Sequence, residues 1–222
     1  MATVFDIDFT SAPDGALNSH VPAGMQWSDA SGFSIADPFI SGGRLVCTAG
    51  NYVRLNKTVG GDPYGDVLSS WYVNGGYSAV PGHIDTQFTL GVDSFLAFGC
   101  VRDDPYPGSP LFSFYVSPAG VAKVQCKLYY GDPAVTVGSG PLLIDGAINT
   151  ARVSWDEYSV TFTLNGSVVY YRASADRPGM HPFIKISGSA KVSRISAGDL
   201  QPDPPADPVV FWRNRKNATE LL

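Results

Sequence analysis

Hydrophobic and polar residues alternate with a period of two along much of the chain. In residues 121–130 small or apolar side chains alternate with lysine and glutamine, and the same rhythm runs through 83–90, 151–155 and 159–164. Successive side chains of a strand point to opposite faces, so these segments predict antiparallel strands with one buried and one solvated face. In the last of them we expect Val160, Phe162 and Leu164 to point into the core.

Turn residues separate these segments at short intervals. Asn165-Gly166 lies between residues 160–164 and 168–171, which predicts a hairpin with a two-residue turn. Asp14-Gly15, Asn74-Gly75, Asp145-Gly146 and the four Asp-Pro pairs before residue 200 are further turn candidates. No segment predicts a helix of three turns, and we expect about eleven to fourteen strands. The fold class predicted is all-β, a two-sheet antiparallel jelly-roll sandwich.

Composition supports this fold class. The 222 residues include 24 glycines, 17 prolines and 18 aspartates, but only two glutamates, Glu157 and Glu220. Aspartate favours turns and glutamate favours helices, so a helical bundle and a coiled coil are excluded. The net charge of −5 argues against nonspecific nucleic-acid binding.

The ends and the cysteines indicate where the protein is made. The first residues lack a basic start and an apolar run, so no signal peptide is predicted. No stretch approaches the roughly 18 apolar residues of a membrane span, and we expect no membrane partner. Cys47, Cys100 and Cys126 each lie in an apolar run, which predicts buried, reduced thiols. We therefore expect synthesis in a host cytoplasm without export.

The composition changes after residue 200. Residues 201–208 contain four prolines and predict an extended linker between a sandwich domain of residues 1–200 and a tail of residues 209–222. The tail has a net charge of +2, which leaves −7 on residues 1–208. An aromatic, basic tail on an acidic body favours docking to a neighbouring subunit, because an exposed Phe-Trp pair is unusual without a partner; the alternative is a frayed terminus that docks nowhere. The docking candidates are Phe211, Trp212, Arg213, Arg215 and Lys216.

Several short motifs resemble the concanavalin A-like (laminin G-like) jelly rolls found in bacteriophage structural proteins. They are Asp8-Phe9-Thr10, residues 13–17 (Pro-Asp-Gly-Ala-Leu), residues 20–22 (His-Val-Pro), Trp27, and residues 42–45 (Gly-Gly-Arg-Leu). Residues 150–155, the strands around Asn165-Gly166, and residues 192–200 are similar to the closing strands of that family. The resemblance covers about residues 4–200. It implies the sandwich fold and a virion protein, such as a head decoration or tail accessory protein.

The sequence offers little catalytic chemistry. The resembled family includes glucanases with paired glutamates, whereas Glu157 and Glu220 stand alone and adjacent Asp103 and Asp104 point to opposite faces of a strand. Nucleophile-elbow, phosphate-loop and zinc-helix motifs are absent from the sequence. The three histidines, His20, His83 and His181, are scattered and read as ordinary structural or surface-loop residues. We predict no enzyme activity; a glycan hydrolase is the weakest alternative.

Two kinds of binding remain open. Asp62, Asp66, Asp103 and Asp104 place oxygen ligands in predicted loops, which suits calcium, although aspartate is also the ordinary turn residue. We predict no other cofactor. Trp71, Tyr72, Tyr77 and Tyr106 lie in or beside Gly/Pro-rich loops, where flat rings could stack on sugars. Alternatively, residues 71–73 form a strand whose rings pack inside the protein.

The main functional prediction is a non-enzymatic virion structural protein, attached to other virion proteins or to its own copies through residues 209–222. The alternative is a carbohydrate-binding or adhesion module that recognises host-surface glycans.

Overall fold

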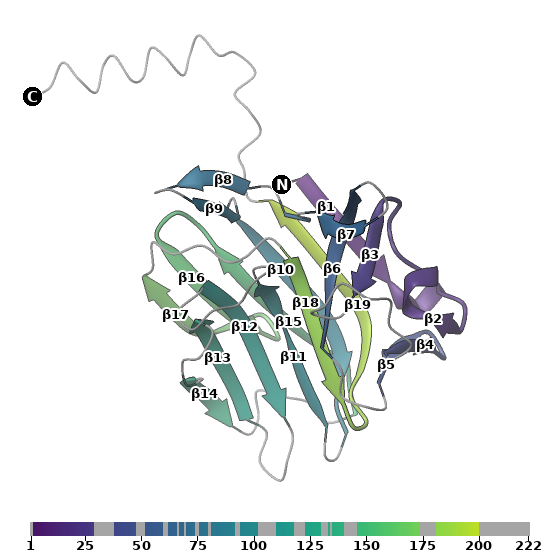
Figure 1. The fold of residues 1–222 in the computed structure, drawn as a ribbon. Coiled ribbons are helices and arrows are strands. Elements are labelled where there is room, and N and C mark those ends of the chain that lie inside the picture. The colour runs from purple at the N-terminus through teal and green to yellow at the C-terminus, as the bar shows by residue number, and fades with distance from the viewer. Residues whose placement is uncertain are drawn as a thin grey trace, which may run out of the picture.

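The structure is a computed structural model in which nearly all of the described chain is β-strand (Figure 1). It describes residues 2–28, 38–47, 52–59, 62–65, 67–68, 70–73, 76–79, 81–91, 94–101, 110–117, 123–129, 133, 135–139, 146–173 and 181–199. For the strands β7, β8, β9, β12 and β13, bounded below, it describes the backbone path and its pairing.

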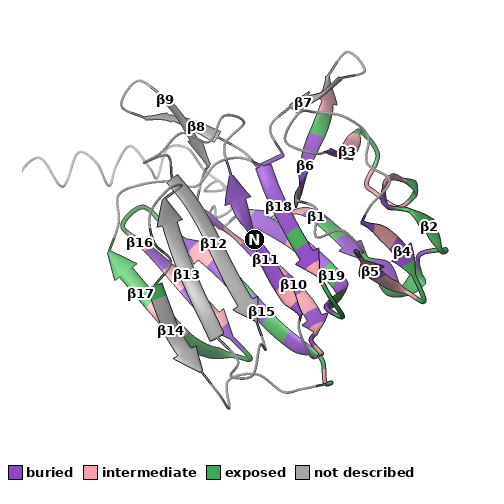
Figure 2. Ribbon diagram, turned by 60° about the horizontal axis from the view of Figure 1, so that its bottom comes forward, coloured by how far each residue is buried: buried purple, intermediate pink, exposed green. Residues whose placement is uncertain are grey.

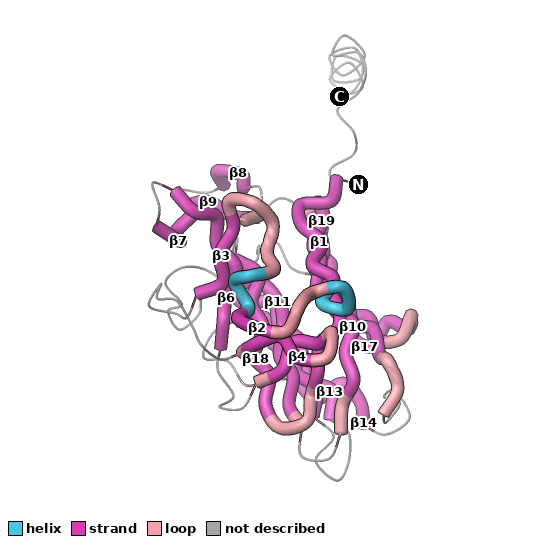
Figure 3. Tube along the Cα trace, turned by 90° about the vertical axis from the view of Figure 1, so that its right-hand side faces the viewer, coloured by secondary structure: helices cyan, strands magenta, loops and turns pink. Residues whose placement is uncertain are grey.

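The strands form two large antiparallel sheets, which we call sheet A and sheet B. Figure 3 views the molecule from the side and separates β1, β19 and β10 of sheet A from β3, β6 and β18 of sheet B. Sheet A contains, in spatial order, β17 (Ser167–Ala173), β16 (Ser159–Leu164), β15 (Asn149–Trp155), β10 (Gly82–Thr89), β19 (Lys191–Asp199), β5 (Arg44–Val46), β4 (Phe39–Ser41) and β2 (Gly15–Ala16), with β1 (Ala2–Asp8) also paired to β19. Sheet B contains β14 (Val135–Ser139), β13 (Lys123–Tyr129), β12 (Pro110–Ser117), β11 (Phe95–Val101), β18 (His181–Ser187), β6 (Tyr52–Val59) and β3 (Met25–Ser28), with β7 (Asp62–Gly65) paired to β6. A separate two-stranded ribbon joins β8 (Ser70–Val73) to β9 (Gly76–Ala79).

The core lies between the two sheets, and the period-two pattern of the sequence supplies it. Along β10 buried and half-buried residues alternate strictly, and β16 repeats this with Val160, Phe162 and Leu164 all buried, as predicted. Sheet B contributes Leu96, Phe98 and other inward residues to the same cluster. Figure 2 shows that burial extends along β11 and β18, whereas β17 at the end of sheet A is mostly exposed. The two-sheet sandwich predicted from the sequence is therefore confirmed.

The hairpin predicted at Asn165-Gly166 joins β16 to β17. Both residues have positive φ, 48° and 80°, which is the backbone that a two-residue turn between twisted strands requires. The Asn165 side chain also holds the neighbouring strand, because its Oδ1 accepts from the Thr150 N–H at 2.8 Å and its Nδ2 donates to Asn149 Oδ1 at 2.8 Å. Asn165 thus adopts the backbone conformation of the turn and also bonds the turn to β15.

The opening motif builds a corner at the end of β1. Asp8 Oδ1 accepts from the backbone N–H of Thr10 at 2.9 Å and from its hydroxyl at 2.6 Å, which caps the 3₁₀ turn η1 (Phe9–Ser11). His20 Nε2 lies 2.9 Å from the Asp8 carbonyl oxygen, just beyond the second turn η2 (Leu17–Ser19). Asn18 bonds both backbone groups of Trp27, accepting from its N–H at 2.7 Å and donating to its C=O at 2.9 Å. These motif residues therefore specify the fold.

Some sequence expectations need correction. The described residues form 19 strands rather than about eleven to fourteen, because short strands such as β2, β4 and β5 carry too few residues to show a period. Gly15 begins β2 and pairs with Ile40, so Asp14-Gly15 is a strand entry rather than a hairpin turn. His83 and His181 lie on β10 and β18 and not in surface loops. Other expectations hold, since Cys47 and Cys100 are buried and free, and the two helical elements among the described residues are three-residue 3₁₀ turns.

Candidate functional site

The predicted docking tail cannot be placed. Residues 200–222 lie outside the described residues, and with them Phe211, Trp212, Arg213, Arg215 and Lys216. Cys126 is described by its backbone in β13 alone. The predicted division into a domain of residues 1–200, a linker and a tail therefore stays a prediction.

The aromatic residues predicted to bind glycans lie partly on the separate ribbon. Trp71 and Tyr72 belong to β8 and Tyr77 to β9, with Tyr72 paired to Tyr77 in register. Residues 71–73 thus do form a strand, in a ribbon that belongs to neither large sheet, whereas packing of their rings in the core or an interface stays a prediction, as does glycan binding. Tyr106 lies outside the described residues.

The structure does not bring the predicted calcium ligands together among the described residues. Asp62 begins β7, and Asp66, Asp103 and Asp104 lie outside the described residues. Within the described ranges no three histidine, cysteine, aspartate or glutamate residues form a metal-binding group. Glu157 is exposed in the turn between β15 and β16. No helix among the described residues has the length and hydrophobicity to span a bilayer.

Part of the outer face of sheet B, turned away from the core, is itself buried, although Lys185 of β18 is exposed on that face. Phe183, Ala97 and Val101 form a small apolar cluster there, separate from the main core. Asn56 Nδ2 donates to Ser28 Oγ at 2.6 Å, and both residues are fully buried. A ligand arriving from solvent therefore has no open access to this part of sheet B.

The outer face of sheet A, in contrast, carries an open hollow of about 560 Å³, which we call the groove. Its floor is the sheet, and its walls are seven outward-facing polar side chains from β16, β15, β10 and β19. Register places these residues in two neighbouring cross-strand rows. The first row is Thr163, Arg152, Asp85 and Ser196, and the second is Thr150, Gln87 and Arg194.

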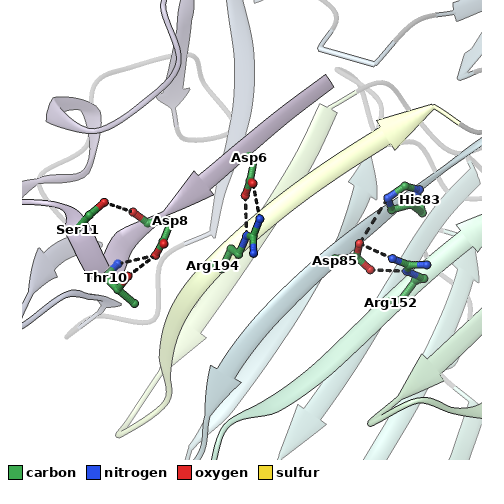
Figure 4. Close-up of polar contacts among 8 residues, drawn as sticks. All are labelled: Asp6, Asp8, Thr10, Ser11, His83, Asp85, Arg152 and Arg194. Carbon is green, nitrogen blue, oxygen red and sulfur yellow. Dashed lines mark hydrogen bonds and ion pairs between the residues drawn. The ribbon is translucent and has the colours of Figure 1, made fainter. Parts of the chain in front are cut away.

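Two arginine–aspartate pairs organise this face (Figure 4). Arg152 donates two hydrogen bonds to Asp85, from Nε to Oδ1 at 2.5 Å and from Nη2 to Oδ2 at 2.9 Å. Arg194 donates two hydrogen bonds to Asp6 of β1 in the same way, from Nε to Oδ1 at 2.7 Å and from Nη2 to Oδ2. His83 Nε2 approaches Asp85 Oδ2 to 3.4 Å from the same strand. Each guanidinium uses two of its five N–H donors in its pair, so three remain for other acceptors.

These pairs keep the face ionised but nearly neutral. The hydrogen bonds that Arg152 donates to Asp85 raise the pKa of Arg152, and those that Arg194 donates to Asp6 raise the pKa of Arg194, so both guanidinium groups stay charged. Hydrogen bonds from Thr10 lower the pKa of Asp8, which lies on the same strand as Asp6. Two arginines thus share the face with three carboxylates.

An exposed aromatic ring lies on the same outer face of sheet A, one strand beyond the groove. Tyr171 of β17 is paired with Thr161, whose neighbours Val160 and Phe162 both face the core, so Tyr171 is on the outer face. Its side chain is 62% exposed, whereas the ring of Tyr170 packs against buried Phe162, with ring centroids 5.8 Å apart. One tyrosine of this pair therefore faces inward and the other outward. A flat exposed ring beside polar groups is a feature that sugar-binding surfaces use.

Sequence reasoning missed the groove although its residues stand at polar positions of recognised strands. Asp85 and Arg152 each alternate with apolar neighbours, which marks them as outward-facing. The signal that was lacking is the register that places Arg152 opposite Asp85 and Arg194 beside Asp6.

Comparisons with known proteins support the fold. No protein-family model and no curated protein matches the chain. Among solved structures, the Emp47p carbohydrate recognition domain aligns with a TM-score of 0.55 at 12% identity, over 88% of this chain and 95% of that chain. The Emp46p carbohydrate recognition domain, in a potassium-bound form, aligns with a TM-score of 0.53 at 11% identity, over 89% and 96%. SCLam, a non-specific endo-β-1,3(4)-glucanase of family GH16, aligns with a TM-score of 0.54 at 11% identity, over 88% and 89%.

Identities this low establish architecture and leave activity open, since this sandwich carries both sugar recognition and sugar hydrolysis in those proteins. From its two antiparallel sheets and these neighbours, the chain has the fold of a two-sheet jelly-roll sandwich.

Proposed function

We propose that this protein is a non-enzymatic carbohydrate-binding domain that uses the groove on the outer face of sheet A. The observation that carries the proposal is the lining of the groove. Seven polar side chains from four strands surround an open volume of about 560 Å³, within the range of small-molecule sites. The carbohydrate recognition domains that share the fold add support by analogy.

The chemistry of the lining suits binding better than hydrolysis. Glycoside hydrolysis ordinarily uses two carboxyl groups flanking the scissile bond. Asp85 is the one carboxylate among the residues that line the groove, and Arg152 holds it in a bidentate pair. Among the described lining residues Asp85 therefore has no second carboxylate to share that chemistry.

The test is a glycan array with the purified protein and matched variants. Gln87→Ala removes an amide that lines the groove, and Tyr171→Ala removes the exposed ring on the same face, one strand beyond the groove. Lys57→Gln changes an exposed residue of sheet B and serves as the control. We expect array signals that fall in the two groove variants and persist in the control. No signal from the unaltered protein would end the proposal.

The ribbon of β8 and β9 provides the competing location for the same function. Trp71→Ala belongs in the same array experiment because Trp71, Tyr72, Tyr77 and Tyr106 were the sequence candidates. Loss of binding in Trp71→Ala, with unchanged binding in both groove variants, would move the site to the ribbon.

A virion role with attachment through residues 209–222 remains a separate proposal, which carbohydrate binding does not oppose. It rests on the resemblance of the opening motif and on the aromatic, basic composition of the tail.

A further inference from the structure

We propose that the groove selects neutral oligosaccharides of more than one sugar ring and discriminates against anionic ones, an inference that rests on the proposed carbohydrate-binding function. The carrying observation is that each arginine of the groove is already bonded to a carboxylate of the protein itself.

The first argument concerns charge. An anionic ligand that accepts from the remaining N–H groups of an arginine would lie beside Asp85 or Asp6, whose negative charge would repel it. Asp8 adds a third negative charge to the same face. A site for an anion normally offers a guanidinium whose fork is unoccupied. The groove therefore presents hydrogen-bond donors without an excess of positive charge.

The second argument concerns donors and acceptors. A hydroxyl group donates one hydrogen bond and accepts others, so a polyol needs both kinds of partner within reach. The remaining N–H groups of Arg152 and Arg194 donate, and the carboxylate of Asp85 accepts. Gln87 and the hydroxyls of Thr150, Thr163 and Ser196 can do either. This mixture matches a neutral sugar.

The third argument concerns length. The groove crosses four neighbouring strands, β16, β15, β10 and β19. Adjacent strands lie about 4.8 Å apart, so the lining extends over about 14 Å across the sheet. That span exceeds a single sugar ring. We therefore expect affinity to rise from monosaccharide to disaccharide and trisaccharide.

The decisive variants release one arginine from its carboxylate. Asp85→Asn leaves Arg152 with a neutral partner, and Asp6→Asn does the same for Arg194. Both pairs are substantially exposed, so their loss costs under about 1 kcal/mol and the variants should fold. Lys57→Gln, on the other sheet, controls for a change of one charge.

The experiment measures binding of neutral and anionic oligosaccharides, first on an array and then by calorimetry at about 0.05 and about 0.5 M salt. The unaltered protein should bind neutral glycans, with affinity changing less than about twofold between the salts. Asp85→Asn should weaken neutral binding and raise binding of uronic-acid or sialylated oligosaccharides by about fivefold or more.

The outcomes separate the two proposals. Preferential, salt-sensitive binding of anionic glycans by the unaltered protein would overturn the neutral-ligand inference and leave carbohydrate binding intact. Equal affinity for mono- and trisaccharides would overturn the length argument. If the unaltered protein binds no glycan of either class, the proposed function itself is wrong.

Discussion

The turn between β4 and β5 offers a matched pair of substitutions that separates backbone strain from steric contact. Gly42 and Gly43 form this two-residue turn, and both have positive φ, 56° and 67°. A Cβ at residue 42 would have no atom within 4 Å. A Cβ at residue 43 would lie 3.1 Å from the Thr10 carbonyl oxygen and 3.2 Å from its Cα. Those are backbone atoms of η1, which Asp8 holds in place.

The expected losses in the free energy of unfolding differ accordingly. Gly42→Ala carries the cost of a side chain in the left-handed region, about 1 kcal/mol. Gly43→Ala carries the same cost and also forces η1 away from the turn, which adds about 1–3 kcal/mol, as overpacking elsewhere does. Both substitutions lower the conformational entropy of the unfolded chain by the same amount, so this contribution cancels when the two free energies of unfolding are compared.

Urea unfolding followed by tryptophan fluorescence measures the difference. With a slope of about 3 kcal/mol/M, Gly43→Ala should unfold at a midpoint about 0.3–1 M below that of Gly42→Ala. Equal midpoints for the two variants would show that the approach of Thr10 to Gly43 contributes nothing, and the reasoning would be refuted.

Three further predictions concern a thiol, a carboxylate and the tail. Burial raises the pKa of the Cys100 thiol, so mass spectrometry should find Cys100 unalkylated in the folded protein at pH 8 and alkylated in urea; rapid labelling without denaturant would contradict its burial. The pKa of Asp8 is lowered from its ordinary 3.8 by bonds from Thr10, so the stability it confers is present above about pH 4 and disappears as the pH falls below that value. The stability gap between the unaltered protein and Asp8→Ala, measured by urea unfolding, should therefore shrink from pH 6 to pH 3, and a constant gap would count against this role. Deletion of residues 202–222 should leave the thermal unfolding midpoint unchanged, because every described core residue precedes residue 199, and should abolish incorporation into a virus particle; normal incorporation would rule out attachment through the tail.

Local features of the fold could be predicted because neighbours in sequence determine them. The alternation in residues 159–164 specifies which side chains of β16 are buried. Asn165-Gly166 specifies its turn, since few other residues adopt two successive positive φ values. In both cases the physical cause lies within a few residues of the effect.

The groove could not be predicted because its parts are distant in sequence. Arg194 and Asp6 are separated by 188 positions, and Arg152 and Asp85 by 67. A shift of one residue in the pairing of β10 with β15 would send one of the two side chains to the other face of the sheet. Alternation showed that these charges face outward, but only the register shows which of them meet.

The position of the last strand has a consequence for how the protein is made. β19 pairs with β10 on one side and with β1 and β5 on the other, so it lies inside sheet A and not at its edge. A ribosome delivers β1 and β10 long before β19, and until then both present unpaired backbone edges and uncovered apolar faces. We therefore expect folding to be slow and to finish only when residues 191–199 are available. Until then, we expect chaperones to cover the unpaired edges and apolar faces of β1 and β10.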